Sequence, residues 1–328
     1  MSGEAVIEIE NLTKRYGEFV ALQSLSLTVE RGRILGLIGP NGAGKTTTIK
    51  ILVGLSRPTS GVARIAGADC TNDVRKIKRL VGYMPDKFGS YENMRVREYL
   101  DFFGAAFGIR RSARNKRIDE VLEITDSTYM QDRYVESLSH GMQQRVGIAR
   151  TLLHDPEVLI FDEPANGLDP KARVEMRELL LRLAGMGKTL IVTSHILPEL
   201  ARICDRVAIL SGGGLRAAGT LAEIMKTVTQ ARLLEIQLNS ADQVDAAAAI
   251  LGEFAGPGSE VVRSESERTV QVRTSRREDE WHELASKLIG AGVRFSQLRE
   301  IQTDLEDAYL SVTEPSSKAD AKRSVTHV

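Results

Sequence analysis

Alternating apolar and polar residues dominate the first part of the chain. Ile7 and Ile9 alternate with acids, and Leu25, Leu27 and Val29 alternate with hydroxyl side chains. Side chains of a strand point to opposite faces in turn, so this period of two predicts strands with one buried face.

Other short runs are apolar almost throughout: 34–38, 158–161, 190–193, which ends in Thr193, and 207–210. A central strand that is covered on both faces has this composition. Apolar residues at helical spacing lie between the runs, for example in 142–153 and 176–183, and Asp169 followed by Pro170 is typical of a helix start. Strands alternating with helices predict an α/β fold built on a parallel sheet.

The pattern changes near residue 229. From there, short segments follow one another in the order β-α-β-β-α-β, which predicts a small α+β domain of the ferredoxin-like type. Residues 314–328 are polar and predict a flexible tail. The expected organisation is therefore a first domain over 1–228, an accessory domain over 229–313 and a tail over 314–328.

Composition limits the classes of function. The chain has 328 residues, 42% of them hydrophobic, and 44 basic residues balance 44 acidic ones. A protein held on nucleic acid by phosphate neutralisation is usually basic, so zero net charge disfavours that class. The two cysteines, Cys70 and Cys204, form no disulfide or zinc motif. No signal-peptide pattern and no apolar run of ~18 residues is present, so a role in transport would need another chain to cross the membrane.

The strongest chemical motif follows the apolar run at 34–38. It comprises Gly39, Pro40, Asn41, Gly42, Ala43, Gly44, Lys45 and Thr46, with Thr47 next in the chain. It matches the phosphate loop G-x-x-x-x-G-K-[ST] in its required position between a strand and a helix. The backbone would surround the phosphates of ATP, Lys45 would neutralise them and Thr46 would ligate Mg²⁺. The alternative is a glycine turn beside an exposed lysine.

Two acids end the apolar run at 158–161. Asp162 is predicted to ligate Mg²⁺, and Glu163 to orient or deprotonate the attacking water. By itself this pair also fits solvated acids at the end of a strand. Together with the phosphate loop upstream, it predicts ATP hydrolysis.

A segment between these motifs carries a family resemblance. Leu138-Ser139-His140-Gly141-Met142 resembles the L-S-G-G-Q signature of ABC-type ATPases, with His140 in place of the first glycine. The order of motifs over residues 5 to about 225 is similar to that family too. The resemblance implies an ABC cassette, with a parallel core, an antiparallel β subdomain and a helical subdomain, that dimerises head to tail around two ATP molecules. It also implies that Ser139, Gly141 and Met142 contact the γ-phosphate of ATP held by the other subunit, whereas a helix cap is the simpler role of Ser139.

The resemblance assigns three further positions. It implies that Tyr16 stacks on adenine, that Asp169 lies in the loop that crosses the dimer interface, and that His195 reaches the γ-phosphate as a catalytic switch beside Glu163 and Lys45. A tyrosine at a strand end, a simple helix cap and a structural histidine are the respective alternatives.

One position departs from the family. After Met84-Pro85 the family usually carries glutamine, and this chain has Asp86. Its carboxylate is still able to ligate Mg²⁺ but adds a charge, and a loop aspartate without a role is the alternative.

The resemblance implies an ATPase subunit of a bacterial exporter. The subunit would work at the cytoplasmic face of the membrane, as a homodimer or with a similar cassette, through a separate membrane-spanning chain that selects the cargo. A soluble ABC ATPase acting on DNA or ribosomes is the alternative. It is disfavoured because residues 45–139 are too few for a long coiled coil and only one phosphate loop occurs. A non-hydrolysing scaffold is disfavoured by Glu163. Basic clusters at 75–79 and 110–117 are interpreted as solvated helix faces rather than contacts with lipids or a partner.

Overall fold

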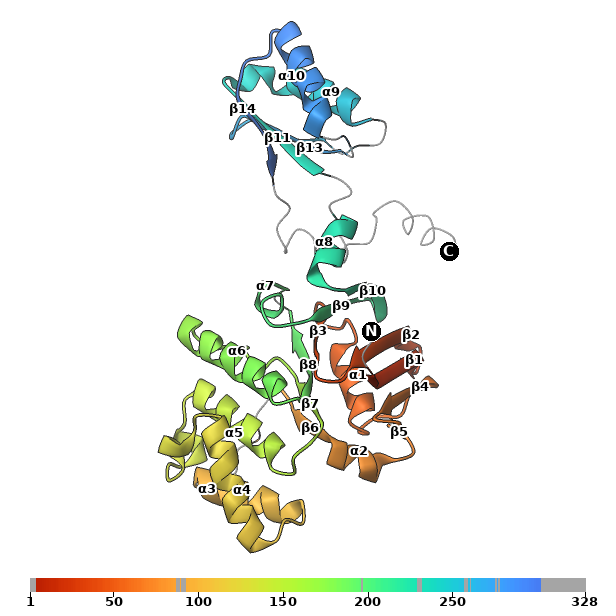
Figure 1. Ribbon diagram of the computed structural model, residues 1–328. Coiled ribbons are helices and arrows are strands. Elements are labelled where there is room, and N and C mark those ends of the chain that lie inside the picture. The colour runs from red at the N-terminus through yellow and green to blue at the C-terminus, as the bar shows by residue number, and fades with distance from the viewer. Residues whose placement is uncertain are drawn as a thin grey trace. The chain divides into compact units, whose positions relative to one another are not determined.

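The chain folds into two compact units, Met1–Leu221 and Ala222–Val328, and each is described by itself (Figure 1). The computed structural model describes residues 4–301 except 87–88, 90–92, 196, 229–231, 257–258, 260, 275 and 277. The two units divide after Leu221, at the start of helix α8 (Leu221–Val228), whereas the sequence predicts the boundary after residue 228, at the end of that helix. The predicted tail, 314–328, and the rest of the chain after 301 lie outside the described residues.

A six-stranded sheet forms the centre of the first unit. Its order is β10-β9-β3-β8-β7-β6. The bounds of these strands are β3 Ile34–Ile38, β6 Val81–Met84, β7 Val158–Phe161, β8 Thr189–Ser194, β9 Arg206–Ser211 and β10 Gly214–Gly219. All pairs are parallel except β9 with β10. Every residue of β3, β7 and β8 is buried, so the prediction of a parallel core from continuous apolar runs is confirmed.

A second, antiparallel sheet has the order β2-β1-β4-β5. Its strands are β1 Ala5–Tyr16, β2 Phe19–Glu30, β4 Ser60–Ile65 and β5 Ala68–Asp69. Ile7, Ile9 and Leu25 are buried as their alternation predicts, and they share one hydrophobic cluster with Leu37 of β3 and Ile49 of the first helix. The two sheets therefore pack around a common core beside the phosphate loop.

Helices connect the strands of the first unit. They are α1 Lys45–Leu52, α2 Val74–Leu80, α3 Val96–Ala106, α4 Arg111–Ile124, α5 His140–Leu152, α6 Pro170–Gly185 and α7 Leu197–Leu200, with single 3₁₀ turns at Thr128–Met130 and Val135–Ser137. Helices α3, α4 and α5 gather below the sheets in Figure 1. Among the described helices, none has both the length and the apolar character that crossing a membrane requires.

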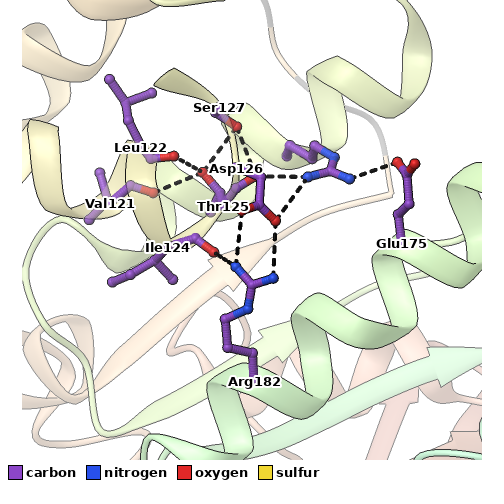
Figure 2. A network of polar contacts seen from close by, with 9 residues as sticks. Val121, Leu122, Ile124, Thr125, Asp126, Ser127, Glu175 and Arg182 are labelled. Atoms are coloured by element: carbon purple, nitrogen blue, oxygen red, sulfur yellow. Dashed lines mark hydrogen bonds and ion pairs between the residues drawn. The ribbon is translucent and has the colours of Figure 1, made fainter. Parts of the chain in front are cut away.

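A polar network joins α4 to α5 and α6 (Figure 2). Asp126, just after α4, has a positive φ of 50° and accepts hydrogen bonds from Arg182 of α6 at 3.1 and 3.2 Å. Arg145 of α5 contacts the same carboxylate at 3.5 Å and Glu175 of α6 at 2.7 Å. The two guanidinium groups also donate to the carbonyl oxygens of Thr125 and Ile124. The bond from Arg182 satisfies the Ile124 carbonyl at the end of α4, and the Thr125 carbonyl also accepts from the Ser127 hydroxyl at 3.1 Å.

We expect Asp126→Asn to lower the free energy of unfolding by about 1 kcal/mol, because the substitution weakens a two-cation network at a partly exposed position. Asparagine tolerates the positive φ, so the change reports on charge rather than on backbone strain. Urea denaturation followed by circular dichroism measures the effect. Asp132→Asn removes an exposed acid outside the network and should leave the midpoint unchanged; equal midpoints for both variants would contradict the assigned role of Asp126.

The second unit contains a four-stranded antiparallel sheet of order β12-β13-β11-β14. Its elements are β11 Arg232–Leu238, α9 Val244–Ala255, β12 Val261–Ser264, β13 Thr269–Thr274, α10 Trp281–Gly290 and β14 Phe295–Ile301, with 3₁₀ turns at Ala241–Gln243 and Glu278–Glu280. Leu234, Ile236 and Val270 on one face of the sheet share a buried cluster with Leu251 of α9 and Leu288 of α10. The opposite alternating position of β11, Glu235, bonds instead to Arg299 and Gln271, so the two faces of the sheet differ in polarity.

Candidate functional site

The phosphate loop connects β3 to α1, as the sequence predicts. At Gly39 a Cβ atom would lie 2.5 Å from the carbonyl oxygen of Leu210, so no larger residue fits against β9. Gly44 has φ 105°, a conformation that glycine adopts at low cost, and no side chain caps the helix that begins after it. The first N–H groups of α1 therefore have no side-chain acceptor and are suited to an anion.

Lys45 joins the loop to the acidic strand end. Its ammonium group donates to the carbonyl oxygen of Gly39 at 2.5 Å and lies 3.5 Å from Oε1 of Glu163. The side chain is only 7% exposed. A buried ammonium with one carboxylate contact is well prepared to pair with the phosphates of a nucleotide, because burial strengthens that attraction.

Asp162 lies between the loop and β8. Thr46 Oγ1 is 3.4 Å from its Oδ2, and the Thr193 hydroxyl donates to its Oδ1 at 2.7 Å. Hydroxyl and carboxylate oxygens are the ligands that Mg²⁺ prefers. The donor set of Thr46 and Asp162 therefore fits Mg²⁺ held together with phosphate oxygens.

Two pKa values in this region are raised. Burial raises the pKa of Asp162, and the negative charges of Glu163 and Asp86 add to the effect, against the hydrogen bond from Thr193. Burial, with Asp162 and Asp86 nearby, raises the pKa of Tyr83 to about 12. Negative charge is thus concentrated at the ends of β6 and β7, where a divalent cation would be stabilised.

Glu163 has an uncommon backbone conformation, with φ 54°. Its N–H donates to Thr193 Oγ1 at 2.8 Å, and its Oε2 lies 3.0 Å from Nδ1 of His195. The side chain is 14% exposed and sits between the imidazole and the ammonium of Lys45. This arrangement fixes the direction of a carboxylate that is still accessible to a small molecule such as water.

Asn166 connects three segments that carry predicted site residues. Its side-chain N–H donates to Oδ1 of Asp86 at 3.2 Å, and its carbonyl oxygen lies 2.9 Å from Nε2 of His140. The end of β6, the loop after β7 and the first residue of α5 are therefore linked through one side chain and its backbone.

The remaining predicted residues lie at helix starts and on a hairpin. Ser139 caps α5 by accepting from the Met142 N–H at 3.5 Å, and Asp169 caps α6 by accepting from the Ala172 N–H at 2.7 Å. Both cap predictions are confirmed. In the part of the chain that the structure describes, no hydrogen bond or ion pair joins Ser139, Gly141 or Met142 to the phosphate loop. That they act on nucleotide held by another subunit stays a prediction.

Tyr16 ends β1 and pairs with Phe19 across the hairpin, and the Lys14 ammonium lies 4.8 Å from its ring centroid. Phe19 lines the hollow of about 150 Å³ over residues 40–47. Tyr16 is not among the residues that line it. Its adenine contact stays a prediction, and Phe19 is a second aromatic candidate.

Comparisons with known proteins agree with this geometry. Residues 22–166 match the family described as ABC transporter. The chain is 38% identical over 232 residues to the Nod factor export ATP-binding protein I of Burkholderia lata, which covers 71% of this chain and 76% of that protein. The chain belongs to the ATP-binding proteins of ABC transporters.

Two further relatives define the extent of the similarity. The probable multidrug ABC transporter ATP-binding protein YbhF of Escherichia coli (strain K12) is 39% identical over 218 residues, 66% of this chain. The match spans only 38% of that protein's length. A solved dimeric structure of a bacterial ABC transporter cassette has a TM-score of 0.59 at 28% identity and covers 66% of this chain and 98% of its own. Almost the whole solved cassette is therefore matched, by about two thirds of this chain.

Sequence reasoning missed two side chains that organise the site. Thr193 was seen only as part of a strand, yet its hydroxyl contacts both Asp162 and the backbone of Glu163. Asn166 was seen only as part of a loop. A hydroxyl residue directly after the apolar residues 190–192 was the available clue for Thr193, whereas no sequence clue pointed from Asn166 to Asp86.

Asp86 gives a direct test of charge in this ABC protein. We expect Asp86→Asn to tighten ATP binding about threefold to tenfold in the absence of Mg²⁺, because it removes a negative charge that acts on Asp162 beside the phosphate loop. With Mg²⁺ present the gain should disappear, since the variant also loses a predicted metal ligand. Titration calorimetry with and without Mg²⁺ measures both; equal affinities in the absence of the metal would mean that this charge does not reach the nucleotide.

Proposed function

We propose that this protein is the ATP-hydrolysing subunit of a bacterial ABC exporter. The observation that carries the proposal is the meeting of Lys45, Asp162 and Glu163 where β3 and β7 end. Parallel strands bring their carboxyl ends to one edge of the sheet, which is where ligands bind in such folds. Residues 39–47 bind the phosphates of ATP, and Lys45 contacts the β- and γ-phosphates.

A Mg²⁺ ion would be held by a small set of oxygens. Thr46, Asp162 and Asp86 would be its ligands in the proposal, and the effect of Asp86 on the pKa of Asp162 supports their nearness. Bound Mg²⁺ would neutralise charge on the phosphates and orient them. The raised pKa of Asp162 without metal supports this role, because a cation offsets the cost of burying that carboxylate.

Hydrolysis needs one proton to leave the attacking water. As the water oxygen bonds to the γ-phosphorus and the bond to ADP breaks, the Glu163 carboxylate accepts that proton. His195 holds Glu163 through Nδ1, and Thr193 holds its backbone, so the carboxylate stays directed at the phosphate side. In the proposal His195, held beside Glu163, also contacts the γ-phosphate when two cassettes close.

We propose that two cassettes form a head-to-tail dimer. The helix start at Ser139, Gly141 and Met142 then faces the γ-phosphate across the interface, and Asp169 follows the loop that crosses it. The dimeric solved relative supports this proposal. The export proteins among the relatives support a membrane-spanning partner chain and a position at the cytoplasmic face of the membrane.

The accessory domain is proposed to be ferredoxin-like and to begin near residue 229. Its element order β-α-β-β-α-β and its sheet order support this assignment. Strand β13 lies between β11 and β12 and is antiparallel to both, as in a split βαβ unit.

Co-purification from mild detergent extracts of the native cells tests the function. A membrane-spanning chain recovered in stoichiometric amount, together with Mg²⁺-dependent ATPase activity, is the expected result. Recovery with ribosomes or DNA would leave the ATPase intact and assign the protein to the soluble class. Absence of ATP hydrolysis in the purified complex would reject the proposal that this protein is an ATPase.

A further inference from the structure

A cavity of about 440 Å³ is lined by Glu163 and His195, by one side of α6, and by residues of α7 and the segment after it. We call it the α6 cavity. Its volume falls within the range of about 300–1,000 Å³ that is usual for small-molecule sites. Residues 40–47 of the phosphate loop line a separate hollow and are not among the described residues that line the α6 cavity. Most of this cavity is therefore not used by the proposed binding of ATP.

The walls of the α6 cavity are largely apolar. Pro170, Val174 and Leu180 contribute from α6, and Leu200 and Ile203 contribute from the end of α7 and the residues after it. Leu180 and Leu200 are each only 2% exposed, so they form a fixed surface that belongs to the core of the first unit. A molecule that fills this space needs an apolar body.

Two arginines also line the α6 cavity, Arg177 of α6 and Arg202 after α7. In the part of the chain that the structure describes, neither has a carboxylate at ion-pair distance or an acceptor for its guanidinium group. Arg182, further along α6, differs because it is bound to Asp126 at 3.1 Å. A guanidinium group binds a carboxylate through two parallel hydrogen bonds, and Arg177 is partly buried, where such a bond is stronger. The two arginines therefore favour a ligand with an acidic group.

The positions of these charges set the direction of such a ligand. Arg177 lies seven residues after Pro170, which places it about 10 Å further along the axis of α6. Glu163 lines the other part of the cavity and would repel an anion. The acidic group would therefore lie at Arg177 and Arg202, with the apolar body directed toward Glu163 and His195.

We propose that the α6 cavity binds a carboxylate that carries an unbranched apolar chain, and that the bound molecule slows ATP hydrolysis. The chain would contact Glu163 and His195, whose side chains are 3.0 Å apart, and would exclude water from that carboxylate. Binding stands on the cavity and its charges alone. The effect on hydrolysis rests on the proposed function.

Titration calorimetry of the full-length protein without nucleotide tests the binding. The probes are decanoate and 1-decanol, which have the same chain and differ in charge. The wild type should bind decanoate about tenfold more tightly than decanol, because only decanoate pairs with the arginines. The double variant Arg177→Gln, Arg202→Gln should bind decanoate about tenfold more weakly and decanol unchanged. Val174 is 41% exposed, so Val174→Trp places a larger side chain in the cavity without disturbing the core, and it should weaken both probes.

The matched control is Arg75→Gln, Arg79→Gln, which removes two charges from α2, outside the α6 cavity. This variant should bind decanoate like the wild type. Thermal midpoint and ATP affinity should be unchanged in every variant, which excludes misfolding. Equal losses of decanoate binding in the two double variants would overturn the proposal, because binding would then follow total charge. Equal affinity of the wild type for decanoate and decanol would overturn it too.

ATPase assays test the second part of the proposal. Decanoate should slow ATP hydrolysis by the wild type severalfold and leave the Arg177→Gln, Arg202→Gln variant unaffected at the same concentration. Binding of decanoate with no change in the rate would overturn the proposed effect on hydrolysis. A protein that binds decanoate but hydrolyses no ATP in its absence would instead reject the proposed function, because calorimetry measures the binding without nucleotide.

Discussion

Lys45→Ala weakens ATP binding by about 100-fold or more. The ammonium is buried, and its contacts in the free site are one carbonyl and the carboxylate of Glu163. Loss of a buried charged partner costs about 3 kcal/mol or more, which corresponds to at least two factors of ten in the dissociation constant. Titration with a fluorescent ATP analogue in the presence of Mg²⁺ measures it.

Lys50→Ala is the matched control for that experiment. Lys50 lies in the last turn of the same helix α1 and is exposed. The Lys50→Ala variant should bind ATP as tightly as the wild type, whereas Lys45→Ala does not. Unchanged affinity in Lys45→Ala would reject residues 39–47 as the phosphate site, whatever the activity of the protein.

The phosphate loop could be predicted from sequence because its chemistry is local. The residues that hold the anion follow one another, and the apolar run before them identifies the strand. The same holds for the caps at Ser139 and Asp169, where the acceptor and the donor are three residues apart. Patterns of this kind depend on the conformation of one short segment.

Contacts between distant segments could not be predicted in this way. The bond from Thr193 to Asp162 depends on the register of β7 and β8, in which Phe161 pairs with Val192. The apolar runs predict a buried parallel strand but not the register of its pairing, since every residue of both strands is buried. The contact of Asp126 with Arg182 likewise joins residues that are 56 positions apart.

Glu163→Gln slows ATP hydrolysis by about 100-fold to 1,000-fold, the usual contribution of a general base. Glutamine keeps the size of the side chain and its contact with His195 but accepts no proton at neutral pH. Binding through Lys45 and the phosphate loop does not need that proton transfer. The variant should therefore retain ATP and accumulate as an ATP-bound dimer. Single-turnover phosphate release and light scattering with Mg²⁺ and ATP measure the two effects.

Two further variants separate chemistry from charge at this position. Glu178→Gln removes an exposed acid of α6 and should hydrolyse ATP at the wild-type rate. His195→Ala leaves the carboxylate of Glu163 in place but removes the hydrogen bond that orients it, so a loss smaller than that of Glu163→Gln is expected. Hydrolysis by Glu163→Gln as fast as in the wild type would remove Glu163 from the role of base. A hydrolysis-deficient variant that stays monomeric with ATP would instead leave that role intact and reject the closed dimer as its product.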